Sequence, residues 1–166
     1  TPAEEQEIAW VSPDGWRVIG KHLSDLNDDQ MVEISLLVWR EFQPWFIDQY
    51  IPYPGRINNF HNDQNQSCHV ILIGWRNGKY KELWAGSAMA DPLLSFFPAD
   101  VDGDADIDLV ALESHYAYSL DHPAYALTAW EWNGFGFTLL AREKGSFHSM
   151  QVVRSEDDNI FILTGW

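Results

Sequence analysis

One short segment of this acidic chain carries aspartates in a spacing that could hold a metal ion. Its oxygen-bearing side chains alternate with other residues: Asp100, Asp102, Asp104 and Asp108. In a tight turn this spacing brings carboxylate oxygens together, and the backbone carbonyl of Asp106 can add a fifth ligand. Such oxygens are the ligands that Ca²⁺ prefers. The alternative is that these aspartates only favour a turn, because they hydrogen-bond to their own backbone and tolerate left-handed conformations.

A second segment repeats this pattern without gaps. Residues 25–34 align on residues 100–109, and the oxygen-bearing side chains fall at matching positions: Asp25, Asn27, Asp29 and Glu33. In this copy Asn27 lowers the ligand charge, and Gln30 replaces a small residue. The Asp100 segment has Ala105 where an EF-hand loop has its glycine and lacks a glutamate at position 12, which excludes a helix-flanked EF-hand.

The elements that must position these segments are strands. An apolar strand follows each copy, and two more strands flank a shortened third copy at 155–159. The predicted strands cover residues 34–39, 109–112, 150–154 and 160–163. Helical periodicity is weak, and the glycine, aspartate and proline within 83–94 argue against a helix there. Residues 41–67 contain several prolines and are expected to form a long loop.

Three turns of the Asp-Gly or Asn-Gly type alternate with the aspartate segments. They end at Gly15, Gly78 and Gly134, each between apolar or aromatic runs. This is the strongest short-range signal of a β-hairpin. A hairpin followed by a strand pair thus recurs three times along the chain. We predict one all-β domain over residues 1–166, β-propeller-like, with about three four-stranded antiparallel blades.

The two aspartate segments also resemble a known family of repeats. DLNDDQMVEI and DVDGDADIDL are similar to the FG-GAP or VCBS-type repeats of β-propellers, including the integrin-α-like kind. The resemblance implies four-stranded blades, Ca²⁺ held by the aspartate turn, and an extracellular, periplasmic or cell-surface location. The chain lacks a literal Phe-Gly…Gly-Ala-Pro segment. Its opening residues show no targeting peptide, so we expect that peptide to lie outside this sequence.

The number of repeats bears on how the domain could close. Propellers have about four to eight blades, and three units leave sheet edges exposed. We therefore expect either a fragment of a longer propeller or a homodimer that completes a six-bladed ring.

Composition limits the classes of partner. The 166 residues contain 25 acidic and 10 basic side chains, a formal net charge of −15. This charge repels nucleic acids and anionic membrane surfaces, and the apolar runs are too short to span a bilayer as helices. Cys68 is the only cysteine, so an internal disulfide is impossible. The spacing of His61, Cys68 and His69 fits no standard zinc site. His115 and His122 flank Asp121 and could suggest a base with an orienting carboxylate, but an ordinary loop between strands explains them as well.

An aromatic insertion offers the best candidates for ligand contact. Flat amphipathic rings stack on sugars or form hot spots for proteins, and here they are Trp45, Tyr50 and Tyr53. We therefore expect a Ca²⁺-stabilised binding or structural module for a protein or glycan partner, more readily than an enzyme. The alternatives are a propeller-based polysaccharide lyase or hydrolase, in which Ca²⁺ polarises substrate carboxylates, and a purely structural piece of a surface protein.

Overall fold

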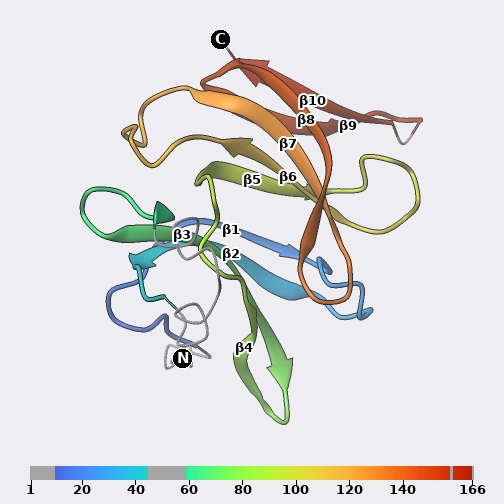
Figure 1. Ribbon diagram of the computed structural model, residues 1–166. Coiled ribbons are helices and arrows are strands. Elements are labelled where there is room, and N and C mark those ends of the chain that lie inside the picture. Colours follow the sequence, from blue (N-terminus) through green and yellow to red (C-terminus); the bar gives the residue numbers. More distant parts are fainter. Residues whose placement is uncertain (1–9, 45–58, 158, 166) are drawn as a thin grey trace, which may run out of the picture.

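The computed structural model describes residues 10–44, 59–157 and 159–165 (Figure 1). No α-helix occurs among them, and the all-β prediction is confirmed. The ten strands of these ranges are β1 Arg17–Ser24, β2 Glu33–Glu41, β3 Gln66–Arg76, β4 Lys79–Ala85, β5 Leu93–Ala99, β6 Asp108–Glu113, β7 Ala124–Trp132, β8 Phe137–Phe147, β9 Ser149–Arg154 and β10 Ile160–Gly165. No helix of the described residues has the length and apolar character needed to cross a membrane.

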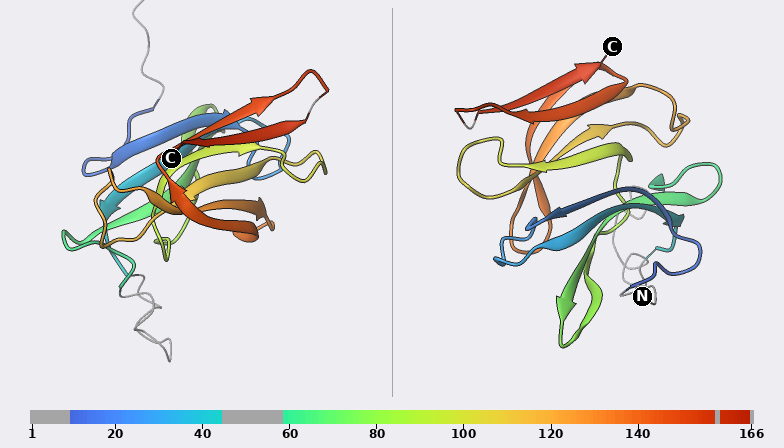
Figure 2. Two further views of the ribbon diagram at one scale, coloured as in Figure 1. Left: turned by 90° about the horizontal axis from the view of Figure 1, so that it is seen from above. Right: turned by 180° about the vertical axis from the view of Figure 1, so that it is seen from behind.

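The strands form three antiparallel sheets in chain order. Sheet A has the order β1-β2-β3-β4, sheet B the order β5-β6-β7-β8, and sheet C contains only β9 and β10. Sheet B lies between sheets A and C (Figures 1 and 2). Four-stranded antiparallel sheets are thus confirmed, but the predicted grouping is wrong: in each, the strand pair around an aspartate segment comes first and the hairpin follows it. The third unit has two strands in the described part of the chain, and the three sheets do not close into a ring.

The predicted turns form to different degrees. Asn77 and Gly78, with φ of 55° and 79°, make the two-residue turn between β3 and β4. The Gly134 turn is wider and spans four residues between Trp132 and Phe137. Near Gly15 the turn forms, but Trp10–Ser12 is not a strand, so this hairpin prediction is wrong for the described residues. Trp10 and Trp16 instead pack on the outer face of sheet A.

Sheets A and B share one apolar core. Side chains of β2 and β3 that face sheet B meet side chains of β5 and β6, and all are buried: Leu37, Trp39, Cys68, Val70, Leu72, Leu93, Phe96, Leu109 and Ala111, together with Leu26 from the first aspartate segment. Burial of each leucine contributes about 1.5–3 kcal/mol. The alternate residues of β2 and β3 are buried on the opposite face of sheet A, which explains the continuous apolar runs.

The sheets approach most closely where β1 crosses β5. A Cβ atom at Gly20 would lie 3.1 Å from the ring of Phe96, so only glycine allows this contact without a shift. The imidazole of His22 meets Phe96 and Phe97 edge-on, with ring centroids 4.8 and 5.0 Å apart. This packing fixes the β1–β2 connection relative to the β5–β6 connection.

Candidate metal centre

The two aspartate segments connect equivalent strands. We call residues 25–33, between β1 and β2, loop 1, and residues 100–108, between β5 and β6, loop 2. Both lie at the same end of the sheets, on the right of Figure 1, where the β9–β10 turn also lies. Register places Ser24 opposite Glu33 and Ala99 opposite Asp108, so each loop is closed by a β-pair at matching positions.

Loops 1 and 2 have the same backbone pattern. Positive φ angles occur at two matching pairs of positions: Asp28 and Gln30 in loop 1, Gly103 and Ala105 in loop 2. In both loops the first aspartate accepts a hydrogen bond from the residue five positions later: Gln30 N donates to Asp25 Oδ2 at 2.7 Å, and Ala105 N to Asp100 Oδ2 at 3.1 Å. The gapless alignment made from sequence therefore describes a shared conformation.

The fifth position of each loop also makes the same contact. Asp29 Oδ1 accepts from Met31 N at 3.0 Å, and Asp104 Oδ1 accepts from Asp106 N at 2.9 Å. These contacts are the self-capping turns that aspartate forms without any ion. They orient the carboxylates and leave further oxygen lone pairs available inside the loop.

The remaining oxygens converge. In loop 2 one carboxylate oxygen from each of Asp100, Asp102 and Asp108 lies within 4.8 Å of the other two. In loop 1 the same holds for Asp25, Asp29 and Glu33. Ligands at about 2.3–2.6 Å from one Ca²⁺ ion are themselves at most about 5 Å apart, so both groups fit around a single ion.

Asn27 adds an amide to the group in loop 1. Its Nδ2 donates to Asp25 Oδ1 at 3.0 Å and to Glu33 Oε2 at 3.1 Å. The amide therefore joins the first and the last acid of loop 1.

Each loop ends in a buried carboxylate. Glu33 and Asp108 are 1% and 3% exposed. Burial and the charges of Asp29 and Asp25 together raise the pKa of Glu33 to about 7, against the opposing effect of Arg76. Burial also raises the pKa of Asp108, against a hydrogen bond from Val101 N. A nearby cation would favour the ionised form of both groups.

The Glu33 side chain has room because its neighbour on β3 is glycine. A Cβ at Gly74 would lie 3.1 Å from Glu33 Cγ and 2.4 Å from Leu83 Cδ1. Glu33 Oε1 is buried and has no hydrogen-bond donor among the described residues. Its nearest cation is Arg76, whose Nη2 is 3.6 Å away. A buried carboxylate oxygen without a donor is costly.

The two loops also influence each other electrostatically. The charge of Asp28 in loop 1 is the largest cause of the raised pKa of Asp106 in loop 2. Asp106 is exposed, so water screens this effect. The repulsion shows that loops 1 and 2 form one acidic end of the molecule.

Some predicted ligands lie apart from the converging groups. Asp104 is not among the oxygens within 4.8 Å in loop 2, and the Asp106 side chain is exposed. In the degenerate third copy, Ser155 Oγ accepts from Asn159 N at 3.1 Å, and its described residues supply no acidic group of this kind. The expected ligand contacts Trp45, Tyr50 and Tyr53 lie outside the described residues.

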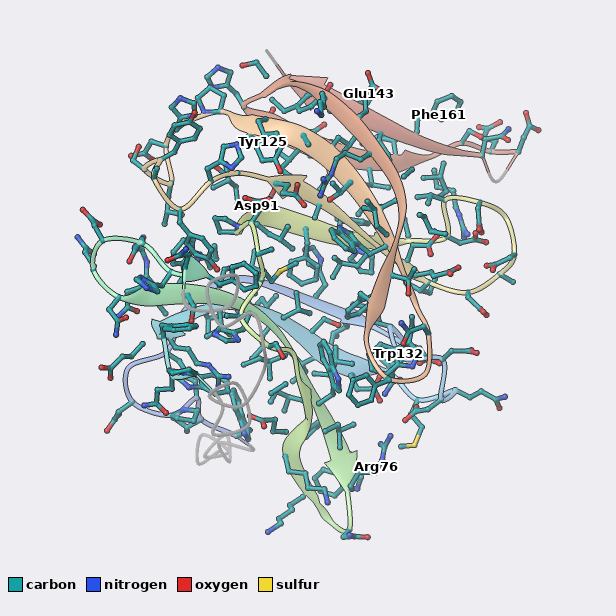
Figure 3. All side chains as sticks on the ribbon, viewed as in Figure 1. Arg76, Asp91, Tyr125, Trp132, Glu143 and Phe161 are labelled. Carbon is teal, nitrogen blue, oxygen red and sulfur yellow. The ribbon has the colours of Figure 1, made fainter. Side chains whose placement is uncertain are left out.

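Sequence reasoning missed a polar network at the opposite end of sheet B. His115 Nδ1 lies 3.0 Å from Asp91 Oδ1, so its carboxylate partner is not Asp121. The Tyr125 hydroxyl contacts Asp91 Oδ2 at 3.1 Å and Glu113 Oε1, and Arg142 Nη2 lies 2.9 Å from Glu113 Oε2. Asp91 and Tyr125 are labelled in Figure 3, far from Arg76. Only spatial proximity reveals this network, since its members are spread over residues 91–142.

His69 and Cys68, which the sequence does not favour as zinc ligands, make other contacts. Both ring nitrogens of His69 have partners, Ser67 Oγ at 2.7 Å and Gly86 O at 2.9 Å. Burial lowers the pKa of His69 to about 4 and raises the pKa of Cys68 to about 12. These residues are structural.

The chain matches no protein-family model, no curated protein and no solved structure.

Proposed function

We propose that the chain is an extracellular or periplasmic binding or structural module of the FG-GAP/VCBS type, whose Asp loops are stabilised by Ca²⁺. It presents its surface to a protein or glycan partner. The observation that carries the proposal is the matched geometry of loops 1 and 2. Both share positive-φ positions and backbone hydrogen bonds, and both gather carboxylate oxygens within 4.8 Å of one another beside a buried acid.

The donor set supports Ca²⁺ over other ions. Every candidate ligand in the two loops is an oxygen, whereas Zn²⁺ sites use histidine and cysteine and Mg²⁺ sites demand near-ideal octahedral geometry with several waters. Carboxylates on a flexible turn suit the larger and more adaptable coordination of Ca²⁺. The ion would connect the first residue of each loop to the buried acid that begins the next strand, and would offset their repulsion.

Sheet C supports a role in assembly. It has two strands where sheets A and B have four, and Phe161 and Leu163 on one of its faces are 52% and 54% exposed. An unpaired edge and an exposed apolar face both favour association with another chain. We propose that a second copy or further repeats complete the ring. Light scattering that shows a stable monomer would exclude the homodimer.

An aromatic cavity supports partner binding. It has a volume of about 510 Å³ between the β3–β4 and β7–β8 hairpins, and its lining includes Trp84, Trp130 and Phe137. Phe135, at the tip of the second hairpin, lines it too and is 88% exposed. Exposed rings beside an apolar cavity bind sugar rings or apolar side chains.

The alternative is a carbohydrate-active enzyme, a lyase or hydrolase. The Asp91–His115 pair beside Tyr125 favours it, because an imidazole oriented by a carboxylate is a common general base. The Tyr125 hydroxyl, however, lies against both Asp91 and Glu113, and Glu113 is 1% exposed and held by Arg142. These groups satisfy one another, so we favour the binding module.

Thermal unfolding with and without Ca²⁺ tests the proposal. An ion that binds only the folded chain stabilises it by about 2.7 kcal/mol at a concentration of about 100 times Kd. Millimolar Ca²⁺ should therefore raise the melting temperature relative to EDTA. Asp102→Asn keeps an acceptor for Asp104 N but removes a ligand charge, and it should abolish most of the rise.

The matched control is Asp121→Asn, which removes an exposed carboxylate from the opposite end of the molecule. This variant should keep the full Ca²⁺ response. Identical melting curves in Ca²⁺ and EDTA would leave the aspartate segments as turns only.

A further inference from the structure

Loops 1 and 2 differ in one charged neighbour. Arg76, the last residue of β3, forms an ion pair with the Asp29 carboxylate, and its Nη2 lies 3.6 Å from Glu33 Oε1. Its other terminal nitrogen, Nη1, donates to Trp75 O at 2.9 Å. The guanidinium is thus fixed at both ends, and its positive charge lies against two of the three acids that converge in loop 1.

Loop 2 has no counterpart of this cation among the residues that the structure describes. Ile73 is opposite Ile34 in sheet A, and Trp130 is opposite Leu109 in sheet B, so Asn133 holds the register position of Arg76. The Asn133 side chain accepts from Phe135 N and Gly136 N at 3.0 and 2.9 Å. Among residues 10–44, 59–157 and 159–165, no basic side chain forms an ion pair with an acid of loop 2.

The acids of loop 1 can be satisfied without any metal. Arg76 lies against Asp29 and Glu33 Oε1. Asn27 Nδ2 donates to Asp25 Oδ1 at 3.0 Å and to Glu33 Oε2 at 3.1 Å. Each of the three acids then has a positive or donating partner. In loop 2 the backbone supplies donors, but no basic side chain of the described ranges pairs with the converging carboxylates.

We propose that Arg76 is a built-in counter-ion of loop 1, which takes the place of a metal ion there, so that the chain takes up one divalent cation, at loop 2. The inference rests on the proposed function and restricts its Ca²⁺ site to one of the two loops. Affinity for Ca²⁺ depends on the number of ligand charges, and a fixed guanidinium both cancels one of these charges and repels the ion. The arginine also makes loop 1 independent of ambient Ca²⁺, whereas loop 2 responds to it.

The test is calorimetric titration of the full chain with CaCl₂. Wild type should bind one ion. Arg76→Gln should bind two, with affinity at loop 1 raised about tenfold or more by removal of the positive charge. Arg76→Gln with Asp102→Ala should bind one, at loop 1. Arg76→Met keeps the apolar stem of the side chain and should bind two ions like Arg76→Gln. It keeps the test valid if one of the two variants fails to fold.

The matched control is Lys79→Gln, because Lys79 is an exposed cation of the same hairpin. It removes the same net charge and should leave one ion bound. Two ions in wild type, or one ion in both Arg76 variants, would refute the role of Arg76 and leave Ca²⁺ binding intact. An absence of Ca²⁺ binding in every protein of the series would refute the proposed function as well.

Discussion

Two buried glutamates at opposite ends of the sheets have different surroundings. Glu33 begins β2 beside loop 1, and Glu113 ends β6; each is 1% exposed. Glu113 receives Arg142 at 2.7 and 2.9 Å and contacts the Tyr125 hydroxyl. Glu33 Oε1 has no hydrogen-bond donor within the described part of the chain, and its arginine is 3.6 Å away.

The difference separates two uses of a buried acid. Around Glu113 the protein supplies both a positive charge and a hydroxyl donor, which is the arrangement that a buried carboxylate needs for stability. Around Glu33 the nearest side chains include two more acids, Asp25 and Asp29, and the arginine lies farther away than in the Glu113 pair. Glu113 is a structural element that joins β6, β7 and β8, whereas Glu33 is held less closely by Arg76 and lies beside acids that raise its pKa.

Removal of the Glu113 partner should produce the largest effect. Arg142→Ala leaves a buried carboxylate without its positive charge, and loss of one partner from such a pair costs about 4 kcal/mol. Urea unfolding measures this cost. The control is Arg17→Ala, an exposed arginine on β1, which should change stability by less than about 0.5 kcal/mol. Equal effects of the two variants would show that the Glu113 network contributes nothing.

The local features of the fold were predictable from the sequence. Asn77-Gly78 forms the expected two-residue turn because both positions need positive φ. The strands after loops 1 and 2 follow from apolar runs that are buried on both faces. The repeated aspartate pattern predicted that the two loops share a conformation, because the turn depends on contacts between residues at most five positions apart. Such signals lie within one short stretch of chain.

Non-local contacts could not be predicted in the same way. Arg76 meets Asp29 across 47 residues, and His115 meets Asp91 across 24. Both pairs exist because strand register brings separate elements together, and no short motif encodes them. The hairpin expected near Gly15 fails in the described residues for a related reason: Trp10 and Trp16 bury their rings on sheet A instead of extending a strand pair.

The pH dependence of stability that Glu33 causes should be smaller than the effect of Arg142→Ala. It tests the Glu33 side of the comparison. Its pKa is raised from 4.5 in the unfolded chain to about 7 in the folded one. The folded state therefore holds the proton more tightly, so without metal the stability from this group is full below pH 4.5 and falls as pH rises towards 7. The loss is on the order of 3 kcal/mol. Urea unfolding in EDTA at pH 5 and pH 8 measures it.

Glu33→Gln is the informative variant, because glutamine keeps the size of the side chain and cannot ionise. In EDTA it should lack most of the wild-type loss of stability between pH 5 and pH 8, and at pH 8 it should be the more stable protein. The comparison with Glu113 predicts no such gain for Glu113→Gln, since that carboxylate has its cation and its hydroxyl donor in place. A parallel decline of wild type and Glu33→Gln would mean that Glu33 is ionised at no cost, and the distinction between the two acids would be lost.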